Sequence, residues 1–299
     1  LAYLLLGNYT KGWEYYEVRF ENDDFEHVTI PTSGPRLRDL AAAPRNGQPP
    51  LVVWSEQGIG DVIQFCRYLN LLDAAGIPFE FFTRPSLMTL MRDWTGLGER
   101  VKAIGSTDPK TDARPHVALM SLPRLFGTEL HTVPSMCPYL QAPVPPREAL
   151  RISTPPAGIS VGLVWASNPD NKAMYRNKSF PLALVMPMFE RLIDLDLIEL
   201  HSLQVGSDAE QLAPWRKRQE IHEWNNRLKD FSDTAQLLRQ LDLVITVDTA
   251  VAHLAGALNK PTWVLLPQNA DFRWLRQRPD SPWYPSMRLF RQKERGNWN

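Results

Sequence analysis

The segment from Leu243 to Leu258 constrains the fold of this chain more than any other part of the sequence. It opens with a short β-branched apolar run, which predicts a buried strand, and continues as an Ala- and Leu-rich stretch, which predicts a helix. Between them stand Asp248 and Thr249, residue types that favour helix N-caps. A second apolar strand is predicted over residues 262–266. A strand, a helix and another strand in this order form the repeating unit of parallel α/β folds.

The turn at Asp248 and Thr249 has the features of an anion-binding site. A helix that begins at the carboxyl end of a parallel strand points its free N–H groups at the crevice where α/β folds bind ligands. Those groups and the helix dipole favour phosphate. His253 follows Thr249 by one helical turn, so both side chains can lie on one face. We therefore expect Asp248, Thr249 and His253 to surround an anion, although the local pattern fits a packed core histidine equally well.

The composition excludes several classes of protein. Lys plus Arg and Asp plus Glu number 33 each, which leaves no surplus positive charge for binding nucleic acid. No apolar run approaches the ~20 residues of a membrane helix, so we expect no membrane span. The two cysteines lack metal-ligand spacing and predict thiols in a reducing, cytoplasmic compartment. The six histidines include no pair at ligand spacing on one helix, so we expect neither a metal site nor a cofactor.

Strand and helix patterns alternate in two separate halves of the chain, which predicts two doubly wound Rossmann-like domains. Seven prolines between Pro134 and Pro156 predict a linker, because such a density continues neither helix nor sheet. The predicted division is a helical hairpin at 1–22, a first domain at 23–145, a linker at 146–158, a second domain at 159–270 and a C-terminal segment at 271–299 that returns toward the first domain.

Several elements within these domains can be assigned from the pattern. Helices are expected at 62–75, 182–193, 209–217 and 234–241, and Pro187 should kink the second of them. Strands are expected at 51–55, 79–82, 101–104, 116–119, 159–165, 198–203, 243–247 and 262–266.

The string Asp-Thr-Ala-Val-Ala-His-Leu-Ala-Gly-Ala-Leu-Asn-Lys-Pro at residues 248–261 resembles the nucleotide-binding motif of the heptosyltransferase family. This resemblance implies a glycosyltransferase of the GT-B fold, in which two Rossmann-like domains face a cleft, and a nucleoside-diphosphate sugar as donor. It further implies that Asp248, Thr249, Ala250 and His253 bind the donor. Ala250 stands where the family motif has glycine.

The N-terminal residues Gly7, Tyr9 and Trp13 resemble the end of a tetratricopeptide repeat. Such repeats cannot bury their apolar face alone, and arrays need about three of them. The resemblance implies the tail of a longer array that could bind a protein partner. An ordinary helical hairpin packed on the first domain is the alternative.

A glycine-rich turn with Gly58, Gly60 and Asp61 follows the strand at 51–55. It is similar to a Gly-Asp-Val segment of heptosyltransferases, which implies an acceptor-side loop with Asp61 as general base. A carboxylate within hydrogen-bond reach can take the proton of an acceptor hydroxyl as that hydroxyl attacks the anomeric carbon. Alternatively, Asp61 only caps the following helix, whose dipole would lower the pKa of its carboxyl.

The same turn also admits a dinucleotide-binding interpretation. Residues 58–63 follow a strand and open a helix, but Ile63 replaces the third glycine of the fingerprint. Glu80 ends the next strand at about the distance expected of an acid that binds ribose. A nicotinamide or flavin enzyme therefore stays open at this point.

Arg176 and Lys178 are the cations expected near the donor, because they follow the strand that ends near residue 165. A cation there would stabilise a diphosphate leaving group. Lys178 resembles the phosphate-contacting lysine of heptosyltransferases, and Arg176 is the alternative. Gln204, which follows the strand at 198–203, is a further candidate for contact with the nucleotide base or ribose.

We therefore predict an inverting, metal-independent glycosyltransferase that moves a sugar from a nucleoside-diphosphate sugar to a hydroxyl of a glycan or protein. Asp61 and Lys178 are the predicted catalytic residues. A dinucleotide-dependent oxidoreductase, a catalytically inactive nucleotide- or sugar-binding module and an interaction scaffold are the alternatives.

Overall fold

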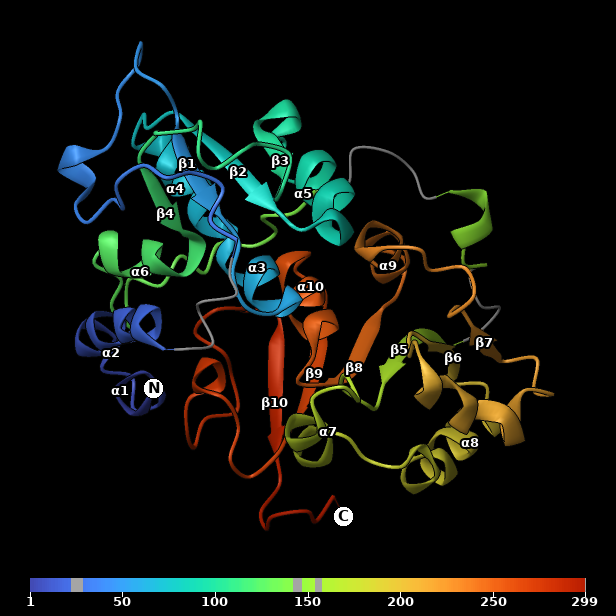
Figure 1. Cartoon of the computed structure of the whole chain (residues 1–299). Helices are drawn as coiled ribbons and strands as arrows, with labels where there is room; N and C mark the ends of the chain where they lie inside the picture. The colour runs from blue at the N-terminus through green and yellow to red at the C-terminus, as the bar shows by residue number, and fades with distance from the viewer. Residues whose placement is uncertain (23–28, 142–146, 154–157, 299) are drawn as a thin grey trace.

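A computed structural model of the chain describes residues 1–22, 29–141, 147–153 and 158–298. It contains two β-sheets with helices packed against them (Figure 1). The first sheet comes from residues before 119 and the second from residues after 158. All strand pairings within the two sheets are parallel, which confirms the predicted α/β class.

The first sheet has the strand order β3-β2-β1-β4. All four residues of β1 are buried, as expected of a strand that is covered on both faces. The strands are β1 (Leu51–Trp54), β2 (Phe79–Thr83), β3 (Val101–Ala103) and β4 (His116–Ala118). The α-helices of this half are α3 (Ile59–Phe65), α4 (Arg67–Ala74), α5 (Met88–Trp94) and α6 (Leu122–Leu125).

The second sheet has the order β10-β9-β8-β5-β6-β7. Its strands are β5 (Ile159–Val164), β6 (Ile198–Ser202), β7 (Ile221–Glu223), β8 (Leu243–Val247), β9 (Thr262–Leu266) and β10 (Met287–Arg291). Its α-helices are α7 (Lys172–Lys178), α8 (Met186–Asp194), α9 (Phe231–Leu238) and α10 (Ala250–Ala257). Among the described residues, no helix has both the length and the apolar character needed to cross a membrane.

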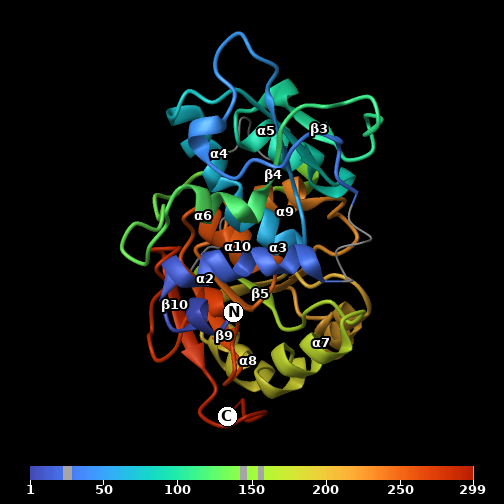
Figure 2. The same ribbon diagram turned by 60° about the vertical axis from the view of Figure 1, so that its left-hand side comes forward.

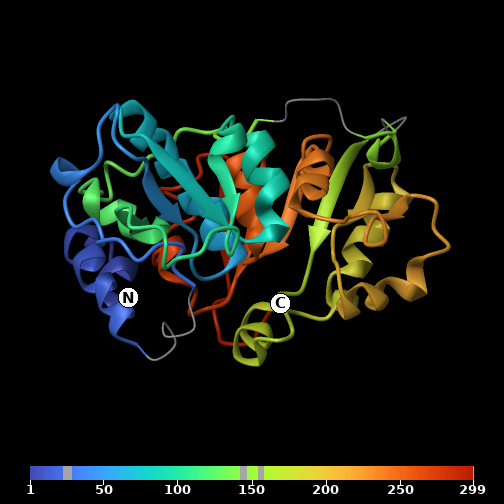
Figure 3. The same ribbon diagram turned by 45° about the horizontal axis from the view of Figure 1, so that its top comes forward.

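One hydrophobic core runs through both halves of the molecule. It joins Val53 of β1 and Val62 of α3 to Leu254 of α10 and Val264 of β9, all of which are fully buried. Helix α10 packs against α3, so the two sheets meet through their helices (Figure 3). The opposite face of the second sheet has a core of its own, which is built around α8.

The segment after β9 crosses to the first half before it returns. Trp283 donates its indole N–H to the hydroxyl of Tyr9 (3.1 Å), and its carbonyl accepts a hydrogen bond from Arg67 (2.8 Å). The chain then forms β10, which pairs with β9 at the edge of the second sheet. This last strand was not expected from the sequence, because exposed Arg288 and half-buried Arg291 interrupt the apolar pattern.

The N-terminal hairpin consists of α1 (Ala2–Leu5) and α2 (Tyr9–Tyr16), and α2 lies across the junction of the two halves (Figure 2). The Trp13 ring is buried and makes edge contacts with Phe65 and Trp283. One face of this hairpin is therefore covered by the rest of the chain, whereas Leu6 and Tyr15 are exposed. Whether further repeats precede it stays a prediction.

Some local predictions were wrong. Helix α3 begins at Ile59, not at Val62, so Asp61 lies in its first turn. Pro187 occupies the first turn of α8, where a missing N–H costs nothing, and so it does not kink that helix. The helix expected at 209–217 is a 3₁₀-helix at Ser207–Trp215 that contains Pro214.

The structure also adds elements that the sequence pattern did not predict. The segment with Arg176 and Lys178, which was assigned no helix, is helix α7. Strand β7 was missed because it has only three residues. Of the predicted linker at 146–158, residues 146 and 154–157 lie outside the described residues.

Candidate functional site

Two strand-to-helix junctions meet where α3 packs against α10. The first junction runs from β1 through Gly58 into α3 and carries Asp61. The second runs from β8 through Asp248 and Thr249 into α10 and carries His253. Parallel strands bring such junctions to their carboxyl edges, so residues far apart in the sequence come together here.

Asp61 is held by contacts to both halves of the molecule. Its Oδ2 accepts a hydrogen bond from the Gly58 N–H (2.7 Å), which closes the N-terminus of α3. Its Oδ1 forms an ion pair with Arg273. Burial raises the pKa of the Asp61 carboxyl above its usual value, and Arg273 opposes this rise. The capping role predicted as the alternative is present, but the predicted lowering of the pKa was wrong because burial outweighs it.

Lys178 forms an ion pair with Asp248, with 2.7 Å between Nζ and Oδ2. Asp248 is almost fully buried, and Lys178 is the last residue of α7. Arg176 lies exposed on the same helix. Of the two cations predicted near the donor, Lys178 is therefore the one that reaches the β8–α10 junction.

The N-terminus of α10 has no side-chain cap. Thr249 occupies the N-cap position in an extended conformation, and its side chain makes no capping hydrogen bond. Its hydroxyl lies 3.2 Å from that of Thr246. Ala250 is the first helical residue and is half-buried. The N–H groups of Ala250 and Val251 thus have no side-chain acceptor, as at helix ends that bind phosphate, whereas the Ala252 N–H donates to the carbonyl of Thr249 (3.1 Å).

His253 is buried between the two halves. Its Nδ1 lies 2.9 Å from the Tyr284 hydroxyl, and its ring stacks on Trp274 with 5.3 Å between centroids. Burial lowers the pKa of His253 well below its usual value, with Arg273 acting in the same direction. The imidazole is therefore neutral near pH 7. His253 is packed in the core, as the alternative interpretation of the sequence predicted. Contact with an anion stays a prediction.

Gln204 supports the end of β5. Its side-chain oxygen accepts hydrogen bonds from the backbone N–H groups of Trp165 (3.1 Å) and Ala166 (2.9 Å). The side-chain amide donates to the carbonyl of Val205 (3.2 Å). These bonds engage the side-chain oxygen and one of the two amide N–H donors, and contact with a nucleotide stays a prediction.

Two residues of this site were not predicted from the sequence. Arg273 lies in a short 3₁₀-helix after β9 and pairs with Asp271 (2.6 Å) as well as with Asp61. The Asp61–Arg273 contact spans 212 positions in the sequence, so no local pattern signals it. The site then holds the carboxylates of Asp61, Asp248 and Asp271 against the cations of Lys178 and Arg273.

The glycines of the first junction serve the packing of the two halves. A Cβ on Gly60 would lie 2.8 Å from Cδ2 of His253 and 3.5 Å from Cα of Ala250. The Gly58 N–H is taken by Asp61, and Glu80 pairs with Arg114 (2.7 Å). The groups required for a dinucleotide are thus engaged within the chain, which disfavours the oxidoreductase alternative.

A separate cluster of potential metal ligands lies on β6 and β7. The donor atoms of Glu199, His201 and His222 lie within 4.8 Å of one another, because alternate residues of β6 share a face and His201 pairs with His222. The sequence prediction considered helical spacing alone and missed this arrangement. However, Nδ1 of His201 accepts a hydrogen bond from the Trp224 indole (3.2 Å). The neutral ring then carries its proton on Nε2. A histidine that binds a metal through Nε2 would instead carry its proton on Nδ1 and donate it, so this tautomer does not suit a metal ligand.

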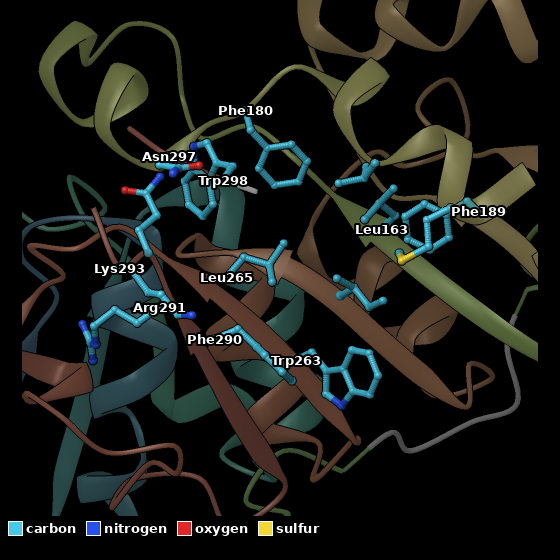
Figure 4. A pocket seen from close by; sticks show the side chains of 14 residues that line it. Leu163, Phe180, Phe189, Trp263, Leu265, Phe290, Arg291, Lys293, Asn297 and Trp298 are labelled. Atoms are coloured by element: carbon cyan, nitrogen blue, oxygen red, sulfur yellow. The ribbon is translucent and has the colours of Figure 1, made fainter. Parts of the chain in front are cut away.

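An apolar cavity of about 360 Å³ lies on the face of the second sheet that is turned away from α10 (Figure 4). Phe189 of α8 and Leu163, Trp263, Leu265 and Phe290 of the sheet line it. It contains none of the candidate site residues and is separate from the α3–α10 junction.

Part of the second half of the chain is similar to a known protein family. Residues 228–275 match the model of Glycosyltransferase family 9 (heptosyltransferase). This segment contains Asp248, Thr249, Ala250, His253 and Arg273. The chain is also 28% identical to Protein FlbA of Caulobacter vibrioides over 333 aligned positions, which cover 99% of this chain and 51% of that protein. The chain thus spans about half the length of this relative.

Solved structures show the same fold at low sequence identity. The E. coli ADP-heptose lps heptosyltransferase II is 13% identical with a TM-score of 0.51, and the match covers 81% of this chain and 90% of that one. The glycosyl transferase family 9 protein from Veillonella parvula DSM 2008 is 12% identical with a TM-score of 0.52, covering 81% and 86%. The fold is therefore GT-B.

Proposed function

We propose that this chain transfers a sugar from a nucleoside-diphosphate sugar to a hydroxyl of a glycan or protein, with inversion and without a metal. The observation that carries the proposal is the meeting of Asp61 with the uncapped end of α10, beside the Lys178–Asp248 pair. A base and an anion site thus lie at one junction. The family 9 match over residues 228–275 supports the donor side.

The donor diphosphate binds at the N-terminus of α10. The first N–H groups of the helix and its dipole stabilise the anion, and Ala250 and Thr249 form the backbone around it. The Asp248 carboxylate would repel phosphate, so it does not contact the diphosphate itself. Its role is to hold Lys178 in place through their ion pair. Negative charge on the diphosphate grows as its bond to the anomeric carbon breaks, and Lys178 stabilises that charge.

The acceptor hydroxyl approaches from the α3 side. Asp61 takes its proton while the oxygen forms a bond to the anomeric carbon and the nucleoside diphosphate leaves. A carboxylate has about four lone-pair positions, of which Gly58 and Arg273 occupy two, so acceptor sites remain on Asp61. A single displacement through an oxocarbenium-like transition state inverts the anomeric configuration.

A protein partner would meet the acceptor side through the N-terminal hairpin. The Tyr16 hydroxyl donates to the side chain of Gln57, which lies next to Gly58 (2.9 Å between oxygens). The hairpin is thereby bonded to the acceptor-side loop. A cytoplasmic location fits the two free cysteines.

The test measures both binding and turnover. A panel of nucleoside diphosphates and their sugars should raise the melting temperature of the protein, because a ligand at 100 times its Kd stabilises by ~2.7 kcal/mol. Release of nucleoside diphosphate in the presence of glycan or peptide acceptors should then be detected. Binding without any release would favour the inactive-module alternative, and no binding at all would contradict the proposal.

A further inference from the structure

Arg273 is the buried cation at the junction of the two halves. Only 9% of its side chain is exposed, and its guanidinium lies over the ring of Phe272 at 4.3 Å. Nη1 donates to Asp271 (2.6 Å), and Nη2 contacts Asp61. The proposed reaction uses Asp61 but gives Arg273 no role.

The contact with Arg273 fixes one of the two oxygens of Asp61. The other oxygen is fixed by the Gly58 N–H at 2.7 Å. With both oxygens bonded, the carboxylate plane has a defined orientation relative to the N-terminus of α10. The forked guanidinium of arginine is suited to this because it can serve two carboxylates at once, whereas the ammonium of lysine is a compact point charge.

The charge of Arg273 also bears on the protonation of Asp61. Burial raises the pKa of this carboxyl and favours its neutral form, which cannot act as a base, and Arg273 is the largest influence that opposes this rise. The other titratable or charged groups around this pair include Tyr9 and Tyr16 of α2, Asp248 and His253 at the α10 junction, Lys178 of α7 and Asp271.

We propose that Arg273 is a positioning residue that orients the Asp61 carboxylate at the junction and opposes its protonation. The inference rests on the proposed function, in which Asp61 is the base. Arg273 links Asp61 to the segment after β9, so the acceptor-side base is held in place by the donor-side half of the chain.

The test compares Arg273→Met, which removes the charge, with Arg273→Lys, which retains the charge but not the fork. Arg278→Met is the matched control, because Arg278 lies in the same segment and pairs with Asp280 at the surface. The first readout is the pKa of Asp61, followed by carbon-13 NMR of labelled aspartate and assigned with Asp61→Asn. The second readout is the pH profile of kcat.

Arg273→Met should raise the pKa of Asp61 by roughly 1 to 3, the usual influence of a neighbouring cation. Because a base works when deprotonated, the acidic limb of kcat should move to higher pH by the same amount, with activity recovering in alkaline solution. Arg273→Lys should lower kcat without moving this limb. Arg278→Met should leave both readouts unchanged.

An unchanged pKa of Asp61 in Arg273→Met would overturn the proposal. If Arg273→Met does not fold, a kcat of Arg273→Lys equal to that of the wild type would overturn it. A loss of kcat that is equal at every pH would indicate a structural role alone and would also overturn it. A different result, full activity of Asp61→Asn, would refute the proposed base itself.

Discussion

Two strand-to-helix junctions face each other in this protein, and they end differently. In the first half, Asp61 folds back on the Gly58 N–H and closes the N-terminus of α3. In the second half, Thr249 leaves α10 without a side-chain cap, and Lys178 lies beside the junction. The same local arrangement thus presents a carboxylate on one side and an open, cation-flanked helix end on the other. In the proposed function, the first helix end carries the base and the second binds the anion.

Asp61→Asn should produce the largest effect, because it keeps the side-chain shape and removes the proton acceptor. We expect turnover to fall by ~10²–10⁴-fold. Asp73→Asn is the control, since Asp73 forms an exposed ion pair with Arg100 in the same half. If Asp61→Asn turned over substrate at nearly the wild-type rate, Asp61 would not be the base, and the proposed difference between the two junctions would be contradicted.

Lys178→Ala should come next. Loss of a group that stabilises developing charge typically costs ~10²–10³-fold in kcat. Lys172→Ala, at the exposed start of α7, should be close to wild type. If Arg176→Ala proved more damaging than Lys178→Ala, the donor-side cation would have to be reassigned.

Gly60→Ala tests how closely the two junctions must approach. The added Cβ would lie 2.8 Å from the His253 ring, and overpacking of this kind costs about 1–3 kcal/mol in the free energy of unfolding. Chemical denaturation measures this cost. Combining Gly60→Ala with His253→Ala removes the clashing ring, so most of the Gly60→Ala penalty should disappear in that background. An unrelieved penalty would place the strain elsewhere.

The buried neutral His253 should make stability depend on pH. Its pKa is lowered in the folded state, so below pH ~6.5 the unfolded chain binds a proton that the folded chain does not. The free energy of unfolding should therefore decrease as the pH is lowered. This residue alone should account for about 2 kcal/mol between pH 6.5 and pH 5. In urea denaturation, the free energy of unfolding of His253→Gln should depend on pH less than that of the wild type, by this amount. His131→Gln changes an exposed residue and should keep the pH dependence of the wild type.

Removal of divalent metal should have the smallest effect. The proposed site stabilises the leaving group with Lys178 and helix N–H groups, so turnover should be unchanged in EDTA. Activity lost to the chelator and restored by manganese or magnesium would contradict this mechanism.

Much of the fold could be predicted because apolar runs and turn residues mark it locally. β1, β2, β5 and β8 lie close to their predicted ranges, since each is a short run with few charges. β10 could not be predicted because Arg288 and Arg291 interrupt its apolar residues, and its pairing with β9 depends on a long excursion to the first half. The position of Pro187 shows how a residue that breaks a helix interior is tolerated in a first turn.

The site was predictable only where its residues sit in a local motif. Asp248 and Asp61 each stand at a strand-to-helix turn, which the pattern reveals. Arg273 and Tyr284 meet Asp61 and His253 through tertiary packing alone. The Gln204 side chain looked available in the sequence, but its oxygen accepts hydrogen bonds from the two backbone N–H groups that follow β5. Such engagement depends on distances between strands, which a single sequence does not encode.

The most direct test of the asymmetry between the two junctions is the affinity for a nucleoside diphosphate, measured by calorimetry on three proteins. The wild type and Asp61→Asn should bind the nucleotide that stabilises the protein with similar affinity, because the base belongs to the acceptor side. Lys178→Ala should bind it roughly 10-fold more weakly, the effect of losing about 1.4 kcal/mol of interaction. Equal affinity in Lys178→Ala, or loss of binding in Asp61→Asn, would contradict the division of roles between the two junctions.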